Sequence, residues 1–267
     1  MRTLRSGFTG DDVTSWQTFL RGLSPASQVV VNGVFDSITK EETIKFQSSF
    51  GLTPDGVVGP FTFGKALGLG YSAIQDDDPD KTGPNWPPVP GVTPLSYAER
   101  LDVFGKFSYV PAPVPGNPEA IRITDNWASQ NIVTVNLPQL SKVGPTNVQF
   151  NSAAAYQLKT LFMDWESAGL LDRIVTWGGS WVPRFVRGSR THLSNHAWGT
   201  AFDINVAWNM LGTTPALVGK KGSVRELVEI ANSNGFYWGG HFKGRPDGMH
   251  FEISNLKLRL CAWVDTY

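Results

Sequence analysis

Two short segments of this chain carry the residue types that a hydrolytic metal centre needs. The first contains His196 and Asp203, and the second, about fifty residues later, contains Asp247 and His250. Zinc in hydrolases is typically held by three such nitrogen and oxygen ligands, with a fourth position open to water. The ion lowers the pKa of that water toward ~7 and polarises a carbonyl oxygen, which is the chemistry of amide cleavage. The two segments therefore predict a metallohydrolase core.

The alternation of residue types around His250 indicates which side chains face the site. Met249, Phe251 and Ile253 occupy one face of a predicted strand. His250 and Glu252 therefore point to the other face. A histidine opposite an apolar row is well placed to be a ligand.

His196 and Asp203 are seven residues apart, and this spacing restricts how the chain runs between them. On a flat strand an odd spacing places two side chains on opposite faces. Both can reach one metal ion only if the chain bends, and Gly199 permits such a bend. We therefore expect a turn at Gly199.

One family carries the same residue types in the same order. The chain resembles the zinc peptidases of the D-alanyl-D-alanine carboxypeptidase group over roughly residues 151–254, in the pattern Ser194-x-His196-x-x-Gly199-x-Ala201-x-Asp203 followed by Asp247-x-x-His250. The resemblance implies that His196, Asp203 and His250 hold Zn2+ and that Asp247 is the general base. Some members carry glutamate at that position, and aspartate fits those that cut the L-Ala-D-Glu bond of the bacterial wall.

Further site residues follow from a turn and from the same resemblance. Asp247 lies in a Pro-Asp-Gly turn that can fold its carboxylate toward the attacking water, to take up a proton and return it to the leaving amine. The resemblance points to Arg184 as the arginine that holds the substrate carbonyl or carboxylate, with Arg187 and Arg190 as alternatives. It implies that Ser194 hydrogen-bonds either the substrate or the side chains that surround the metal ligands.

Three other side chains are alternatives for these roles. Glu252 is the second candidate for the general base, because it shares the strand face of the last histidine. His192 lies four residues before His196, a spacing at which two helical histidines could share a metal, but Ser194-Asn195 indicates a loop. We therefore expect His192 at the surface or behind the ligands. His241, which follows two glycines, is expected in a loop.

The elements that must position this site form a predicted α+β domain over residues 96–267. Its opening, through about residue 113, is expected to be irregular or extended, and Asn151 is a predicted helix cap. The predicted strands cover 173–177, 200–204 and 249–253, and the predicted helices cover 151–167 and 224–232. This order suggests a small, mainly antiparallel sheet that holds the zinc site.

Residues 1–70 carry a weak internal duplication. Trp16-Gln17 and Phe46-Gln47 each lie in a predicted helix that is followed by an Asn-Gly or Asp-Gly turn and then by a threonine placed to cap the next helix. Thr39 and Glu42 form a predicted capping box. These features predict an all-α domain of three helices.

The same region resembles the helical peptidoglycan-binding domain found beside many wall hydrolases. The resemblance covers all 70 residues with both halves in register, and its aromatic and glutamine positions are expected to be structural. A generic helical docking module is the alternative. The matching residues are Leu4-Arg5-Ser6-Gly7, Gly10-Asp11-Asp12-Val13, Gln17, Gly33-Val34-Phe35, Phe46-Gln47 and the segment 52–59.

Residues 71–95 are predicted to be a linker. An aspartate run at 76–80 is followed by five prolines, a composition typical of extended, solvated chain. The run lacks the glycine and the terminal glutamate of a calcium loop. Cys261 is the single cysteine, so neither an intrachain disulfide nor a cysteine pair on a metal can form.

Composition limits the expected partners. The chain has 23 lysines and arginines against 23 aspartates and glutamates, so no overall charge attracts nucleic acid or an acidic membrane. No segment reaches transmembrane length, and the first seven residues lack the apolar run of a secretory signal. We therefore expect a monomer without membrane insertion. It would be made in the cytoplasm and reach the wall after holin-dependent release or lysis, as a phage endolysin does. A bacterial autolysin or an exported toxin is the alternative.

The two resemblances together predict a zinc-dependent peptidoglycan peptidase that cuts the stem peptide at the L-Ala-D-Glu bond. A wall-binding domain would raise the local concentration of scissile bonds. The alternatives are a D-alanyl-D-alanine carboxypeptidase, a cross-link endopeptidase and a non-enzymatic wall-binding protein with a structural zinc. The presence of Asp247 argues against the last, because a structural zinc needs no base.

Overall fold

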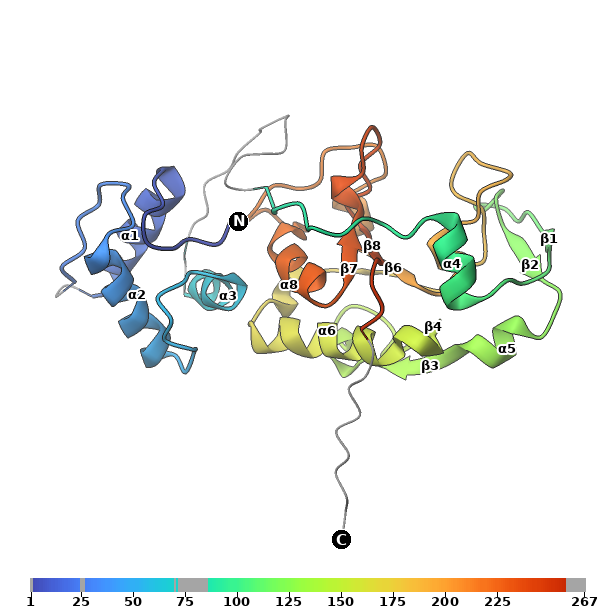
Figure 1. Ribbon diagram of the computed structural model, residues 1–267, viewed down its shortest axis with the longest axis horizontal. Helices are drawn as coiled ribbons and strands as arrows, with labels where there is room; N and C mark the ends of the chain where they lie inside the picture. Colours follow the sequence, from blue (N-terminus) through green and yellow to red (C-terminus); the bar gives the residue numbers. More distant parts are fainter. Residues whose placement is uncertain (1, 25–26, 70, 72–85, 258–267) are drawn as a thin grey trace, which may run out of the picture.

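The computed structural model describes residues 2–24, 27–69, 71 and 86–257 of the chain. A helical N-terminal unit lies beside a larger C-terminal unit (Figure 1). The aspartate run at 76–80 and Cys261 lie outside the described residues. Across the described part of the chain, no helix combines the length and the apolar character that a bilayer crossing requires.

The N-terminal unit contains three helices, as predicted. They are α1 (Asp11–Leu23), α2 (Ser37–Ser49) and α3 (Pro60–Gly68). Trp16 of α1 is fully buried, with its ring centroid 5.5 Å from Phe46 of α2 and 5.9 Å from Phe63 of α3. Its indole nitrogen donates to Thr43 Oγ1 over 2.9 Å, so the polar edge of this large side chain is satisfied inside the core.

The internal duplication is visible in two glutamines that hold equivalent positions. The Gln17 side-chain amide donates to a carbonyl of the following turn over 2.9 Å and to Thr39 Oγ1 over 3.0 Å. The Gln47 amide makes the same two bonds in the second half, over 2.9 Å to the turn and 3.1 Å to Thr62 Oγ1. Each glutamine therefore ties a turn to the first turn of the next helix, which is a structural role.

The predicted capping box of Thr39 and Glu42 does not form. Helix α2 begins earlier, and the Asp36 side chain accepts a hydrogen bond from the Thr39 backbone nitrogen. Thr39 is buried, and its hydroxyl accepts from Gln17 instead. Threonine is a frequent helix cap, but here the donors of a buried glutamine determine where its hydroxyl points.

The C-terminal unit is an α+β domain with small antiparallel sheets, as predicted. Its strands are β1 (Tyr109–Pro111), β2 (Ile121–Ile123), β3 (Ile132–Asn136), β4 (Asn147–Asn151), β5 (Trp177–Gly179), β6 (Ala201–Ile204), β7 (Phe236–Trp238) and β8 (His250–Ile253). Its helices are α4 (Tyr97–Phe104), α5 (Trp127–Asn131), α6 (Ala155–Ser167), α7 (Asn195–Trp198) and α8 (Val228–Ser233). The main sheet has the order β5-β6-β8-β7 with antiparallel neighbours, and β1–β2 and β3–β4 form separate pairs.

Helix α6 packs against the central strands of the main sheet. Phe162 and Trp165 of α6 lie within about 6 Å of Phe202 in β6, with centroid distances of 5.9 and 6.1 Å. Trp165 also lies 5.9 Å from Phe251 in β8. Phe251 is fully buried on this face, so the core holds β8 from one side and leaves its other side for the site.

Several features of this unit differ from the prediction, among them the strand pairs β1–β2 and β3–β4, which lie outside the predicted strands. The strand expected over 173–177 begins only at Trp177, because Leu171–Arg173 forms a 3-10 turn. The opening segment contains α4, for which Ser96 and Glu99 form a capping box. Strand β7 lies outside the predicted strands, because its three residues are too few to show an alternation pattern. Asn151 accepts from the Ala153 backbone nitrogen over 3.0 Å and caps the 3-10 turn Ser152–Ala154 that leads into α6, so the predicted cap lies one turn before the α-helix.

Residues 86–95, here called the strap, pack on the C-terminal unit although they fall within the predicted linker. Trp86 is 5% exposed, and its ring centroid lies 5.7 Å from that of Trp238 in β7. The Arg225 guanidinium lies 4.1 Å from the Trp86 ring. The Pro87 carbonyl accepts a hydrogen bond from His241 Nε2 over 2.9 Å. Trp86 and Pro87 therefore hold the start of the strap against the C-terminal unit.

The two units also contact each other directly. Thr3 Oγ1 donates to Glu229 Oε1 over 2.7 Å, and Val218 is buried in the core of the N-terminal unit. Helix α3 approaches the other unit so closely that a Cβ on Gly64 would come within 2.0 Å of the Ala168 carbonyl oxygen. A glycine at this position therefore permits backbone-to-backbone packing between the units.

Candidate metal centre

Three elements bring the predicted ligands together. His196 lies on α7, which Ser194 caps and Gly199 ends. Gly199 has φ 65°, the left-handed conformation that lets the chain turn directly into β6 and Asp203. Asp203 is paired in register with His250 of β8. The expected turn at Gly199 is confirmed, but a short helix, not the expected loop, carries His196.

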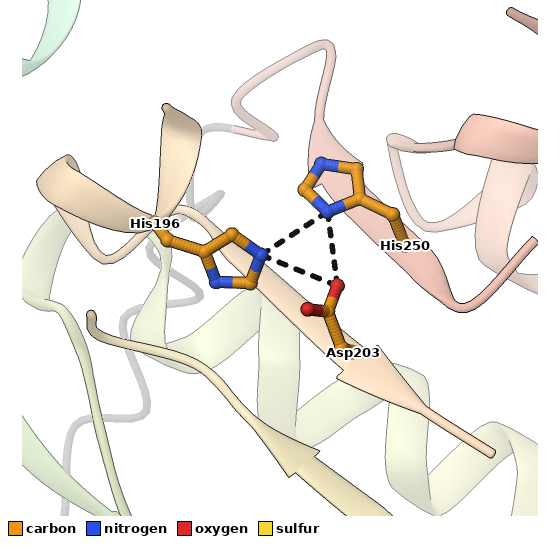
Figure 2. A group of neighbouring side chains, drawn as sticks. All are labelled: His196, Asp203 and His250. Carbon is orange, nitrogen blue, oxygen red and sulfur yellow. Dashed lines mark hydrogen bonds and ion pairs between the residues drawn. The ribbon is translucent and has the colours of Figure 1, made fainter. Parts of the chain in front are cut away.

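The three side chains form a compact triangle (Figure 2). His196 Nε2 lies 3.2 Å from Asp203 Oδ1 and 3.2 Å from His250 Nδ1. His250 Nδ1 lies 3.0 Å from Asp203 Oδ1. Ligands about 2.1 Å from a tetrahedral zinc lie roughly 3.4 Å from one another, so the observed spacing fits one small ion.

Hydrogen bonds behind the two imidazoles decide which nitrogens face the centre. His196 Nδ1 donates to the Ser180 carbonyl over 2.6 Å, and His250 Nε2 donates to Glu252 Oε2 over 2.9 Å. These oxygens are acceptors, so each ring carries a proton on its outer nitrogen. The inner nitrogens can then present lone pairs beside the Asp203 carboxylate, the arrangement of metal-ligating histidines.

The charges around the centre favour a cation. Burial opposes ionisation of Asp203, yet His196 and His250 hold the pKa of its carboxyl well below the usual range. Burial also opposes protonation of His250, but Asp203 and Glu252 outweigh it and raise the pKa of that imidazole to about 10. A divalent cation would displace this proton and satisfy the converging groups together. The residues present therefore fit zinc.

Asp247 lies beside the ligands, in a cleft of about 470 Å³ that His250 also lines. Its Oδ1 atom is buried and accepts no hydrogen bond from the described residues. Burial raises the pKa of the Asp247 carboxyl; the charge of His250 opposes the shift and that of Asp203 adds to it. A desolvated carboxylate has a high proton affinity, which suits a group that must accept a proton from water.

Arg184 reaches the same cleft from the segment that follows β5. Its Nη1 donates a hydrogen bond to the neighbouring Phe185 carbonyl over 3.2 Å. Burial lowers the pKa of the Arg184 guanidinium, and the charges of Asp203 and Asp247 oppose that shift. The side chain is thus close to the carboxylates of the site but holds no ion pair among the described residues.

The two alternative arginines are placed differently. Arg187 lines the cleft, but its Nη1 pairs with Glu119 Oε2 over 2.7 Å. Arg190 is exposed and does not line the cleft. Of the three, Arg184 is therefore the best placed to meet a substrate oxygen. Ser194 also lines the cleft, and its hydroxyl accepts from the His196 backbone nitrogen over 3.4 Å.

The remaining candidates have other roles in the structure. Glu252 accepts hydrogen bonds from His250 and from the Asn195 side-chain amide, so it orients a ligand and is less free than Asp247 to act as base. His192 is exposed, as expected. His241 is buried, 7% exposed, and does not lie in an open loop, because it donates to the strap.

Sequence reasoning missed one of the groups that orient the ligands and part of the cleft wall. Ser180 acts through its backbone carbonyl, for which side-chain identity gives no signal. Pro94 and Leu95 of the strap and Arg100 of α4 line the cleft, although they lie about ninety to one hundred residues before the first ligand. Only the placement of α4 and the strap brings them to the site.

A second and larger cleft, of about 600 Å³, lies on the N-terminal unit around the second half of the duplication. Gln47, Thr53 and Phe61 line it, and Ser167 of α6 adds to its wall. None of the three predicted ligands lines this cleft, so its size says nothing about catalysis.

Comparison with known proteins supports both predicted resemblances. Residues 187–253 match a family model described as D-alanyl-D-alanine carboxypeptidase. Residues 9–65 match a model described as a putative peptidoglycan binding domain. The first match contains the three ligands and Asp247, whereas Arg184 and Arg100 lie before it.

One curated relative is a zinc D-Ala-D-Ala carboxypeptidase of Streptomyces albus G. It is 38% identical to this chain over 77 residues, which is 28% of this chain and 28% of the relative. The chain thus matches little more than a quarter of that relative's length. The resemblances predicted from the sequence, to a peptidoglycan-binding domain and to zinc peptidases of this group, are confirmed.

Proposed function

We propose that this chain is a zinc-dependent peptidase that cuts the stem peptides of bacterial peptidoglycan. The observation that carries the proposal is the triangle of His196, Asp203 and His250. Hydrogen bonds from behind orient both imidazoles, and His250 lines a cleft together with Asp247. The match of residues 187–253 supports the peptidase activity. The match of residues 9–65 supports peptidoglycan as the partner.

The chemistry divides between the metal and the residues of the cleft. Zinc held by the three ligands would polarise the scissile carbonyl and make water acidic enough to attack it at neutral pH. Asp247 takes the proton that the attacking water loses and passes it to the nitrogen of the leaving amine as the C–N bond breaks. Arg184 stabilises the negative charge that develops on the carbonyl oxygen. Water is consumed, and a carboxylate and an amine result.

The bond that we propose is the one between L-alanine and D-glutamate. An aspartate at position 247 and an attached wall-binding domain favour an endopeptidase. An endopeptidase must admit chain on both sides of the scissile bond and needs no cation fixed for a terminal carboxylate. A carboxypeptidase that trims D-alanine is the second candidate, favoured by the uncommitted Arg184 and by the name of the relative. A cut in the cross-link is the third.

The biological role that we propose is that of an endolysin, which is made in the cytoplasm and reaches the wall after holin-dependent release or lysis. The pairing of a wall-binding domain with a peptidase domain is consistent with this role. A non-enzymatic protein with a structural zinc is the alternative from another class. A desolvated carboxylate beside the ligands argues against it, because a structural site needs no proton acceptor.

Two stem peptides that differ only at the C-terminus test the choice of bond. The first has a free terminal carboxylate, and in the second this group is an amide. For an endopeptidase the rates should be similar, and mass spectrometry should detect new D-glutamate amino termini. For a carboxypeptidase the amide would leave an arginine unpaired, at a cost on the order of 2–5 kcal/mol. Release of D-alanine that amidation abolishes would contradict the proposed bond.

A further inference from the structure

A second arginine, Arg100, reaches the catalytic cleft from outside both segments that match known families. It lies on α4, directly after the strap, and lines the cleft together with Pro94 and Leu95. It lies outside the resemblance to zinc peptidases, which covers roughly residues 151–254. Its place in the cleft follows from the fold alone.

Aromatic rings hold the Arg100 guanidinium. Its Cζ lies 5.2 Å from the ring of Trp198 and 5.8 Å from the ring of Tyr97. Trp198 is fully buried on α7, the helix of His196, and its indole nitrogen donates to the Gly105 carbonyl over 3.0 Å. A guanidinium held by ring contacts keeps its N–H groups available for an acceptor.

Those N–H groups find no acceptor among the described residues. Arg100 Nε is buried and makes no hydrogen bond there. Burial lowers the pKa of Arg100, and the charge of Glu252 opposes the shift, so that carboxylate is close. However, Glu252 is engaged by His250 and by Asn195. A buried donor without a partner is costly, and a ligand carboxylate would remove that cost.

The other arginines of the cleft do not fill this role. Arg187 is paired with Glu119, and Arg245 Nη2 donates to the Arg187 carbonyl over 3.2 Å. Arg184 lies near Asp203 and Asp247, where the scissile carbonyl must sit for proton transfer. Arg100 lies near Glu252 instead. The two uncommitted arginines therefore face different parts of a bound substrate.

We propose that Arg100 binds a free carboxylate of the stem peptide, on a residue that does not take part in the reaction, and thereby selects acidic over amidated peptides. The inference rests on the proposed function, because the substrate is an acidic peptide only if the chain acts on peptidoglycan. Arg100 would then be a specificity residue contributed by the fold outside the recognised motifs.

The test combines one substitution with one chemical change in the substrate. The zinc-loaded full chain is assayed on a synthetic stem peptide with free side carboxylates and on the same peptide with those groups amidated. Arg100→Gln should lower kcat/KM for the acidic peptide about 10- to 100-fold, mainly through KM, as loss of one charge-assisted hydrogen bond predicts. The same substitution should leave kcat/KM for the amidated peptide unchanged.

Two further variants separate binding from folding. Arg100→Lys keeps the charge and should recover part of the loss on the acidic peptide. Arg122→Gln makes the same change of charge at an exposed position on β2 and should alter neither rate. Zinc content and melting temperature should match those of the unaltered protein. An equal loss on both peptides, or no loss on the acidic one, would overturn the proposal.

An equilibrium titration gives a reading that does not depend on turnover. In zinc-loaded Asp247→Asn protein, Kd for the acidic peptide should rise about 10- to 100-fold when Arg100→Gln is added. If the unaltered protein cuts neither peptide, the proposed function fails. The titration would still decide the role of Arg100, since equal Kd values for the acidic and amidated peptides would refute it.

Discussion

At the scale of single residues, the proposed zinc site depends on groups that lie behind its ligands. The Ser180 carbonyl and the Glu252 carboxylate take the outer protons of His196 and His250, so the inner nitrogens can act as ligands. Asp247 differs from Glu252 because its buried Oδ1 accepts no hydrogen bond from the described residues. These contacts support the proposed roles of Glu252 in orienting His250 and of Asp247 in proton transfer.

Substitution of the two carboxylates should separate these roles. Asp247→Asn keeps the shape of the side chain but cannot accept a proton, so zinc should remain while kcat falls by about two to four orders of magnitude. Glu252→Gln should weaken zinc binding by about 10- to 100-fold and leave most of kcat at saturating zinc. Zinc titration and steady-state kinetics measure both. The opposite pattern would mean that Glu252 is the base.

The pH dependence of kcat should report the raised pKa of Asp247. Only the ionised carboxylate can accept a proton, so activity is lost as the pH falls through its pKa. Because burial raises that pKa above 3.8, the acidic limb should lie at higher pH than for an exposed aspartate. Zinc content must be measured at each pH, since protonation of His250 also releases the metal. An acidic limb at the ordinary aspartate value, with zinc retained, would contradict this account.

At the scale of elements, one turn determines whether the ligands can meet. Gly199 has φ 65°, and a Cβ there would lie 2.8 Å from Ile132 Cδ1. Gly199→Ala should therefore lower the free energy of unfolding by about 1–3 kcal/mol and weaken zinc binding. Gly116→Ala is the matched control, because φ is 77° but no atom lies within 4 Å of the added Cβ. Equal effects on zinc affinity would show that the turn does not position the ligands.

The parts of the fold that could be predicted are those with a strong periodic or motif signal. Alternation in β8 placed His250 opposite the apolar core, and the odd spacing to Asp203 required the turn at Gly199. The repeated glutamines indicated the duplicated N-terminal helices. Strand β7 is too short for alternation, and the capping role of Thr39 was overridden by a buried partner. The entry of Arg100 into the cleft is a long-range contact with no local signal.

At the scale of the whole molecule, the C-terminal unit extends further toward the N-terminus than the segment that matches the zinc peptidases. The strap is anchored by Trp86, which contacts Trp238 and Arg225, and its later residues line the cleft. The N-terminal unit packs against the C-terminal unit where α3 approaches Ala168 and where Thr3 donates to Glu229 of α8. The two units are therefore in contact in the structure as well as joined by the chain.

Two fragments test the role of the strap. A fragment that starts at residue 86 should fold and cleave soluble stem peptides, whereas one that starts at residue 96 lacks the buried Trp86 ring. Loss of a large buried aromatic costs about 3–5 kcal/mol, so the shorter fragment should melt at lower temperature and lose activity. Neither fragment contains the N-terminal unit, so a difference between them in melting temperature or rate reports on the strap. Equal melting temperatures and rates would mean that residues 86–95 are only a linker.

The central claim is that His196, Asp203 and His250 hold a zinc ion that serves to cut peptidoglycan stem peptides. Mass spectrometry of purified sacculi, digested with the unaltered protein or with Asp203→Ala and paired with zinc analysis of both proteins, tests it most directly. The unaltered protein should carry about one zinc and release fragments with new stem-peptide amino termini, and Asp203→Ala should do neither. Stem cleavage by zinc-free Asp203→Ala, or intact sacculi after treatment with the zinc-loaded unaltered protein, would contradict the claim.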